Sequence, residues 1–299
     1  MSSDQNDQND QNSPQSDYPF PEFGEQSQEH PGLAGRMSPV PDHGEDSYQG
    51  SGKLQGRAAV ITGGDSGIGR AVAIAFAREG ADVLISYLEA EEEDARDTVG
   101  YIEQAGHKAV AMPGDITDEE QCRRVIDRAA EEFGRLDVLV NNAAFQMARG
   151  GIAEIPAEEF DHTFKTNIYA PFHLSKRALE HMVPGGVIIN TTSIQGTEPS
   201  NSLLAYASTK GALVAFNEGL AQETIQRGIR VNSVAPGPVW APLIPATLPA
   251  ESVSGFGQGS PTGRPAQPAE LAPAYVYLAS DESSYINGET IGVTGGMPL

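Results

Sequence analysis

Three residues in the middle of the sequence are of types that could transfer a proton: Ser193, Tyr206 and Lys210. Tyr206 and Lys210 lie four positions apart at the start of a predicted helix, so the Lys210 ammonium lies on the same face as the Tyr206 phenol. A phenol ionises only near pH ~10, but a neighbouring cation favours the phenolate and lowers that pKa. The pair therefore predicts a general acid/base. Most such pairs do nothing, so the prediction depends on the residues around it.

A glycine-rich loop earlier in the chain could hold a diphosphate. Gly63, Gly67 and Gly69 form the pattern Thr-Gly-x-x-x-Gly-x-Gly between an apolar run at 58–62 and a helical pattern at 70–79. Such glycines allow a tight turn and a close approach of the backbone, while the helix N-terminus offers free N–H groups and a positive dipole end. The glycines could instead serve only a structural turn. Their position between the first strand and the first helix favours a dinucleotide site.

The elements that must position these residues alternate regularly from residue 56 onward. Short β-branched runs predict strands, and longer amphipathic segments predict helices that end at Gly80, Gly106, Gly134 and Gly228. The predicted strands are 58–62, 83–87, 109–112, 136–140, 187–192 and 231–234, and the predicted helices are 70–79, 91–104, 118–133, 160–182 and 207–226. Runs buried on both faces and separated by helices predict a doubly wound parallel α/β sheet flanked by helices. We find no second domain.

Polar or tightly turning residues follow four of these strands. They are Asp115 and Ile116, then Asn142, Ala143 and Ala144, then Ser193, and finally Pro236, Gly237 and Val239. Asp115 alone could be a helix N-cap. In open parallel sheets, however, ligands bind outside the carboxyl ends of the strands, so we expect all four ends to meet at one binding rim.

The charge of the chain is concentrated at its start. The 299 residues include 19 Lys+Arg and 41 Asp+Glu, a net charge of −22, and residues 1–50 contribute −9 from ten acidic residues and Arg36. This segment carries Asp-Gln-Asn repeats, six prolines and few aliphatic residues, so we expect an acidic low-complexity tail at 1–50, disordered to about residue 30, and one domain at 51–299. The part containing Tyr18, Phe20 and Phe23 could instead dock on the body or on a neighbouring subunit as an extended arm, although a solvated tail is favoured.

Composition also excludes several classes of function. The acidity argues against nucleic-acid or anionic-membrane partners. No apolar stretch approaches the ~18 residues of a membrane span and none resembles a secretion signal, so we expect a cytoplasmic protein. The single cysteine, Cys122, excludes an internal disulfide, and the six histidines show no metal-ligand spacing, so we expect no metal site.

Together these motifs resemble the short-chain dehydrogenase/reductase family over about residues 53–296. The matching residues are Thr62-Gly63 through Gly69, Asn141 to Ala144 (with Ala144 where the family usually has glycine), Ser193, Tyr206, Lys210, Gly237 and Val293 to Gly296. Residues 63–69 and 272–278, with the acidic tail, are similar to a bacterial subgroup described as general-stress oxidoreductases or aldehyde reductases.

The resemblance implies a Rossmann-type fold and a single NAD(P)-binding domain that transfers hydride between nicotinamide and a carbonyl or alcohol. It implies that Tyr206 exchanges a proton with the substrate oxygen, that Ser193 stabilises the same oxygen, and that Lys210 holds the nicotinamide ribose. The backbone carbonyl of Asn167 would order a water leading from Lys210 to solvent, although Asn167 could be only a tolerated polar residue. The implied cofactor-binding residues are Gly63, Asp65, Ser66, Gly67, Ile68, Gly69, Tyr87, Asp115, Ile116, Asn142, Ala143, Ala144, Tyr206, Lys210, Pro236, Gly237 and Val239.

The choice between NAD and NADP depends on the end of the second strand. Tyr87 stands where NAD-preferring members often have Asp, while Ser66 and Leu88 stand where NADP-preferring members often have a base. The following acidic run, which includes Glu91, would repel a 2′-phosphate unless Arg70 reached it. We therefore lean to NAD and leave NADP open.

The resemblance also makes the Pro- and Gly-rich segment at about 240–265 a lid over the substrate, with Trp240, Leu243, Ile244 and Phe256 as an apolar wall. A passive surface loop is the alternative. It further implies a homotetramer formed through the helices that carry Asn167 and Tyr206. Two rival functions remain: a nucleotide sensor with little turnover, against which the intact Ser193, Tyr206 and Lys210 argue, and a nucleotide-sugar epimerase or dehydratase, which usually has a Thr-Gly-x-x-Gly-x-x-Gly loop and a larger C-terminal domain.

Overall fold

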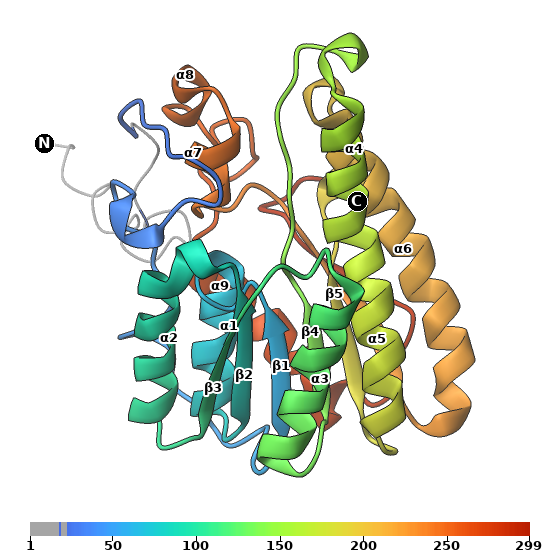
Figure 1. Cartoon of the computed structure of the whole chain (residues 1–299). Coiled ribbons are helices and arrows are strands. Elements are labelled where there is room, and N and C mark those ends of the chain that lie inside the picture. Colours follow the sequence, from blue (N-terminus) through green and yellow to red (C-terminus); the bar gives the residue numbers. More distant parts are fainter. Residues whose placement is uncertain (1–17, 19–22) are drawn as a thin grey trace, which may run out of the picture.

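The computed structural model describes Tyr18 and residues 23–299, which build one twisted parallel sheet between two layers of helices (Figure 1). The strand order is β3-β2-β1-β4-β5-β6-β7, so the direction of winding reverses between β1 and β4. This reversal confirms the doubly wound, Rossmann-type fold. The strands are β1 (Ala58–Thr62), β2 (Asp82–Tyr87), β3 (Ala109–Pro113), β4 (Val138–Asn141), β5 (Val187–Thr191), β6 (Arg230–Pro236) and β7 (Thr290–Val293).

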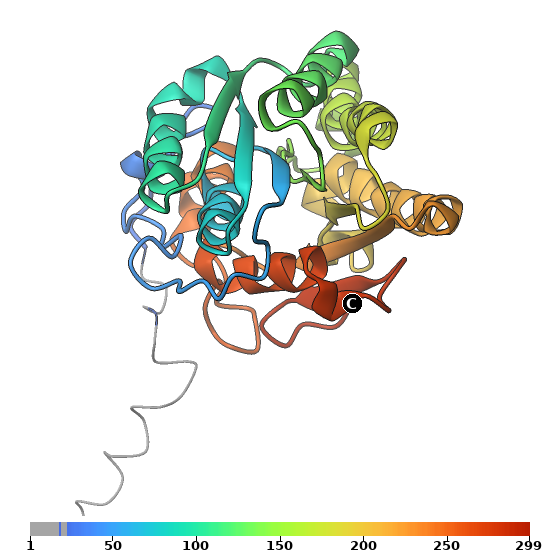
Figure 2. The same cartoon turned by 90° about the horizontal axis from the view of Figure 1, so that it is seen from below.

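Helices cover both faces of the sheet, as the view from below shows (Figure 2). One layer contains α1 (Gly67–Arg78), α2 (Glu92–Gln104) and α9 (Pro268–Ala279). The other contains α3 (Glu119–Phe133), α5 (Ala170–His181) and α6 (Leu204–Thr224). A π-helical turn at Lys165–Tyr169 joins α4 (Ala157–Phe164) to α5, and interrupts the single helix expected over 160–182.

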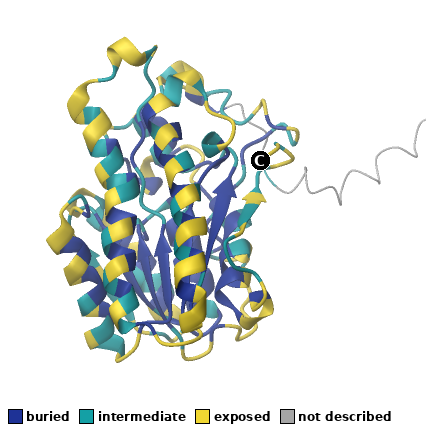
Figure 3. Cartoon of the chain, turned by 90° about the vertical axis from the view of Figure 1, so that its right-hand side faces the viewer, coloured by how far each residue is buried: buried dark blue, intermediate teal, exposed yellow. Residues whose placement is uncertain are grey.

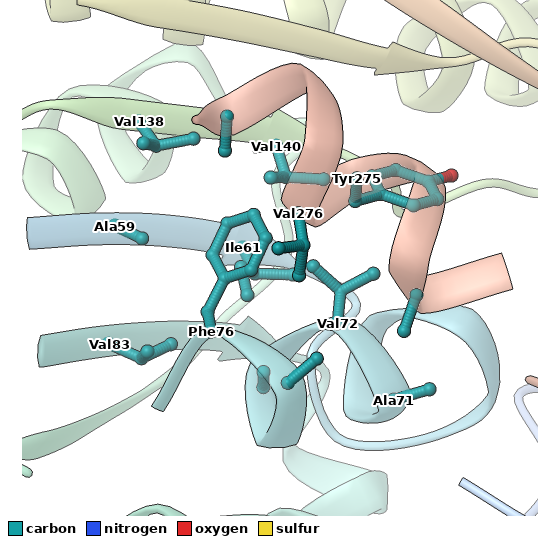
Figure 4. Packing of buried hydrophobic residues seen from close by; sticks show 14 of the residues in the cluster. Ala59, Ile61, Ala71, Val72, Phe76, Val83, Val138, Val140, Tyr275 and Val276 are labelled. Carbon is teal, nitrogen blue, oxygen red and sulfur yellow. The ribbon is translucent and has the colours of Figure 1, made fainter. Parts of the chain in front are cut away.

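Alternate residues of each strand enter the two cores. Ile61, Val83 and Val140 pack against Phe76 of α1 and Tyr275 of α9 (Figure 4). Their sequence neighbours Val60, Leu84 and Leu139 pack on the opposite face, against α3 and α5. Because side chains alternate across a strand and both faces are covered, the strands consist of unbroken apolar runs.

Within the sheet and the two helical layers, β7 and α9 were not among the predicted strands and helices. α9 begins with Pro268 and contains Pro273, and proline inside a helix costs about 3 kcal/mol. Leu271, Tyr275 and Leu278 of this helix are fully buried against the sheet and α1. Burial of this face outweighs the unfavourable local propensity.

The acidic segment does not leave the body at residue 50. Residues 23–48, which we call the N-terminal arm, lie along α1, α2 and the segment 240–265 (Figure 1). Arg78 donates to the carbonyl oxygens of Gly44 (3.0 Å) and Tyr48 (2.6 Å), and the Ala34 amide donates to Asp94 Oδ2 at 2.7 Å. The expected disorder to about residue 30 is therefore wrong for residues 23–30, which dock as an extended arm. Phe20 lies outside the described residues. The boundary between tail and domain expected at residue 50 comes just after the arm, which ends at residue 48, and stays a prediction.

None of the helices in the described part of the chain is long and apolar enough to cross a membrane.

Candidate active site

A cavity of about 430 Å³ lies at the carboxyl edge of the sheet, beyond the neighbouring strands β1 and β4, where the direction of winding reverses. This is the position at which open α/β sheets bind ligands, and the volume suits a small-molecule or cofactor site. Its walls come from the loop after β1, the ends of the neighbouring strands, the start of α6, the segment 240–265 and the N-terminal arm.

The glycine loop forms the floor of one end. Gly63 has φ +61°, and a Cβ on Gly69 would lie 1.8 Å from the Gly63 carbonyl oxygen, so neither position accepts a side chain. The Thr62 hydroxyl accepts hydrogen bonds from the amides of Asn142 (3.0 Å) and Ala143 (3.1 Å), which ties the loop to the end of β4. The bare backbone and the N-terminus of α1 at the cavity fit the diphosphate of a dinucleotide.

The three candidate catalytic residues meet at the other end of the cavity. Ser193 follows β5, while Tyr206 and Lys210 occupy the first two turns of α6, and all three line the cavity. Ser193 hydrogen-bonds to the Tyr206 hydroxyl. Lys210 Nζ lies 5.3 Å from the centre of the Tyr206 ring and donates to the Thr191 carbonyl oxygen at 2.6 Å.

Burial governs the ionisation of this pair. It raises the pKa of Tyr206 to about 12, against which the hydrogen bond with Ser193 acts in the opposite direction. Burial also lowers the pKa of Lys210 to about 7. The expected lowering of the Tyr206 pKa by Lys210 is therefore not found, because desolvation outweighs it and disfavours the ammonium itself. At neutral pH Tyr206 holds its proton, the form needed to donate to a carbonyl.

Asn167 is buried in the π-helical turn and does not line the cavity. Its side chain instead holds the backbone of Phe145: Oδ1 accepts from the Phe145 amide and Nδ2 donates to the Phe145 carbonyl, both at 2.8 Å. Nδ2 also donates to Thr209 Oγ1 at 3.0 Å. Asn167 thus fixes the chain after β4 relative to α6.

The cavity collects nearly all the residues expected to bind a cofactor. Those at its wall are Gly63, Asp65, Ser66, Gly67, Ile68, Tyr87, Asp115, Ile116, Asn142, Ala143, Ala144, Tyr206, Lys210, Pro236, Gly237 and Val239. Gly69 is absent from the wall because it packs beneath the loop.

Comparison with known proteins agrees with this geometry. The family model described as enoyl-(acyl carrier protein) reductase matches residues 63–298. General stress protein 39 of Bacillus subtilis (strain 168) is 48% identical over 281 residues, covering 94% of this chain and 98% of that protein. The chain belongs to the short-chain dehydrogenase/reductase family. The resemblance inferred from the motifs is thereby confirmed.

Two further members of the family illustrate what its relatives bind. NADPH-dependent aldehyde reductase 1, chloroplastic, of Arabidopsis thaliana is 45% identical over 280 residues, covering 91% of this chain and 97% of that protein. The crystal structure of a short-chain dehydrogenase from Burkholderia cenocepacia J2315 in complex with NADP superposes with a TM-score of 0.77 at 34% identity, covering 82% of this chain and 98% of that one.

The segment 240–265 contains two short helices, α7 (Leu243–Thr247) and α8 (Ala250–Val253). Leu243, Ile244 and Phe256 line the cavity, as expected for a short-chain dehydrogenase lid. Trp240 does not: it is 0% exposed and packs on Phe23 of the N-terminal arm. Its expected place in the substrate wall is wrong, because the docked arm supplies an apolar partner on the other side of the lid.

Several cavity residues were missed by the sequence analysis. Extending the strand-end argument by two positions would have found Phe145 and Gln146. The same extension after Ser193 would have found Gln195, and Glu91 belongs to the acidic run already noted after the second strand. His30 and His162 carried no local signal, because their elements reach the cavity only through tertiary packing.

Two carboxyl side chains, Asp65 and Glu91, lie near the ends of β1 and β2. Asp65 is 1% exposed, and burial, with a smaller effect from the Asp94 charge, raises its pKa to about 6. Burial, followed by the charge of Asp65, raises the pKa of Glu91 to about 9. Arg70 does not line this region, because its guanidinium is buried against the Asp94 carboxylate (3.2 Å) and donates to the Asp65 carbonyl at 2.7 Å. The base that could have received a 2′-phosphate is therefore engaged elsewhere.

No group of His, Cys, Asp and Glu side chains within the described ranges is arranged to hold a metal ion.

Proposed function

We propose that this protein is an NAD(P)-dependent oxidoreductase that interconverts a carbonyl compound and its alcohol. The observation that carries the proposal is the meeting of Ser193, Tyr206 and Lys210 at one end of a cavity whose other end is the glycine loop. The nicotinamide cofactor, when bound, supplies or accepts the hydride.

The protein's own side chains then transfer the proton and stabilise the negative charge that develops on the substrate oxygen. In reduction, Tyr206 donates its hydroxyl proton to the carbonyl oxygen, while Ser193 hydrogen-bonds to the same oxygen and stabilises its developing negative charge. In oxidation, Tyr206 takes the proton from the alcohol. Lys210, one turn along α6, is positioned to hold ribose hydroxyls, and its protonated form, which is partly populated at a pKa of about 7, places positive charge beside the phenol.

The test is the variant Tyr206→Phe, assayed against a panel of aldehydes and ketones by following NAD(P)H absorbance. We expect turnover to fall by about a hundredfold or more, the usual worth of a general acid. Tyr101→Phe, on α2 and outside the cavity, is the matched control and should keep wild-type turnover. Wild-type turnover in Tyr206→Phe would refute the acid/base role. A wild-type protein that binds cofactor but reduces none of the panel would support the alternative function, a nucleotide sensor.

We further propose that NAD is preferred over NADP. Asp65 and Glu91 offer carboxyl groups to the ribose hydroxyls, whereas a 2′-phosphate would add negative charge beside the Asp65 carboxylate, with Arg70 turned away. The relatives named above that bind NADP or NADPH point to the opposite preference, so the experiment compares both reduced cofactors. Fluorescence titration with NADH and NADPH tests this preference, and tighter binding of NADPH would refute it.

We also propose a homotetramer that uses the face of α4, the π-helical turn and α5. Phe160 (42% exposed), Tyr169 (49%) and Phe172 (46%) lie uncovered along these helices, on the side of the molecule seen in Figure 3. Exposed aromatic residues of this kind mark interaction surfaces. Light scattering should show a tetramer for the wild type and a smaller species for Phe172→Asp, and a wild-type monomer would contradict the proposal.

A cytoplasmic location stays a prediction.

A further inference from the structure

The N-terminal arm brings a histidine into the cavity. His30 and Pro31 line the wall, and the His30 ring meets the edge of Phe145 with ring centres 5.0 Å apart at 71°. The other partner of Phe145 is His162 of α4, at 4.6 Å and 82°. The arm and α4 thus place two imidazoles against one aromatic ring, which belongs to the chain after β4.

These rings lie close to the proposed catalytic residues. Asn167 holds the Phe145 backbone and bonds to Thr209, whose hydroxyl donates to the Tyr206 carbonyl oxygen at 2.6 Å. The carboxylates at the cavity wall follow β1, β2 and β3, whereas Phe145 follows β4. The imidazoles therefore belong to the substrate end and not to the acidic ribose end.

Neither imidazole makes a hydrogen bond to another group in the described part of the protein. Within Tyr18 and residues 23–299, no hydrogen bond or ion pair involves the imidazole ring of His30 or His162, and both rings contact Phe145. Burial, with a smaller effect from His162, lowers the pKa of His30, so its ring is neutral at pH 7. A neutral imidazole has one donor and one acceptor nitrogen, which matches a hydroxyl group.

The loop that carries His30 is held firmly. The side chain of Gln28 bonds to both backbone groups of Leu33, accepting from its amide at 2.8 Å and donating to its carbonyl at 3.0 Å. The backbone amide of Gln28 donates to the Pro245 carbonyl at 2.9 Å, and Phe23 stacks on Trp240 with ring centres 3.9 Å apart. After the loop, Trp240 Nε1 donates to the Pro39 carbonyl at 2.9 Å, so the arm is attached to the lid on both sides of the loop and His30 is pre-positioned.

We propose that the N-terminal arm forms one wall of the substrate site, and that His30 with His162 binds a hydroxyl group of an uncharged hydroxylated carbonyl substrate. This inference rests on the proposed function and names its substrate class. Gln146 and Gln195 add polar groups to the wall, while Leu203, Leu248 and Phe256 supply apolar contacts. The neutral His30 ring and the two glutamine amides carry no charge, which suits a neutral substrate.

The test compares two three-carbon aldehydes that differ in their hydroxyl groups, glyceraldehyde and propanal. We expect the wild type to show the higher kcat/KM with glyceraldehyde. His30→Phe keeps a ring against Phe145 but removes the nitrogens, so kcat/KM for glyceraldehyde should fall about tenfold, mainly through KM, with propanal within about twofold. His30→Gln should recover part of the loss, and the KM of the cofactor should not change.

Two further variants separate this role from a structural one. Phe23→Ala removes the stack on Trp240 and should reproduce the glyceraldehyde defect, while His107→Phe, remote from the cavity, should change neither aldehyde. Equal losses for both aldehydes in His30→Phe, or an unchanged preference, would overturn the inference and leave the proposed function intact. If the wild type reduces no carbonyl compound at all, the proposed function and this inference fail together.

Discussion

Replacing Asn167 with alanine separates its positioning role from its contribution to stability. Asn167→Ala removes three buried hydrogen bonds and leaves the amide and carbonyl of Phe145 without partners. An unpaired buried polar group costs about 1–3 kcal/mol, so we expect a loss of about 3–5 kcal/mol. In a chain of this size that corresponds to a fall in the thermal midpoint of about 5–8 °C.

The change should also reach the reaction. Freed from Asn167, the chain at Phe145 shifts relative to α6, and a displacement of about 1 Å at a reacting centre costs on the order of a hundredfold in rate. We expect kcat/KM for aldehyde reduction to fall by about that factor, measured well below the new thermal midpoint.

The matched control is Asn232→Ala in β6. Asn232 is also fully buried and holds two backbone groups of the segment before β7, donating to the Ile286 carbonyl (2.9 Å) and accepting from the Glu289 amide (3.1 Å), but it lies away from the cavity. Its replacement should lower the thermal midpoint comparably and leave kcat/KM unchanged. If Asn167→Ala loses stability but keeps wild-type kcat/KM, Asn167 is only structural and the reasoning is wrong.

Three other predictions concern the arm and the buried charges. Phe23→Ala should release the N-terminal arm, so limited proteolysis should cut within 23–48 much faster than in the wild type, while cleavage of the body is unchanged. Glu91→Gln should raise the thermal midpoint: the folded pKa of about 9 exceeds the unfolded value, so the wild type loses stability as pH rises from about 4.5 to 9 and the gain should grow over that range. Lys210→Met should abolish turnover yet stabilise the fold. Because the folded pKa of about 7 lies below the unfolded value, this gain should be largest below pH 7 and shrink towards pH ~10; a gain independent of pH would contradict the burial argument.

Local patterns predicted much of the scaffold and of the cofactor end of the site. β1 was predicted residue for residue, and the bounds of the other predicted strands were within two residues, because covered parallel strands consist of short apolar runs between glycine and polar ends. The same rule placed Asp115, Asn142, Ser193 and Gly237 at one rim, where the structure has them. Local patterns failed to predict α9, because its prolines disfavour a helix whereas its packing stabilises one.

What the sequence determined by itself was therefore the alternation of strands and helices, the family, and a rim that carries Ser193, Tyr206 and Lys210. Only the tertiary structure decided that burial keeps the proton on Tyr206, that Arg70 turns to Asp94, and that the acidic segment docks. The arm shows why. Its composition is that of a disordered chain, and its fixed position depends on a few contacts with residues far along the sequence, such as Phe23 on Trp240. Such contacts leave no periodicity or spacing to read, since only the tertiary fold brings their distant partners together.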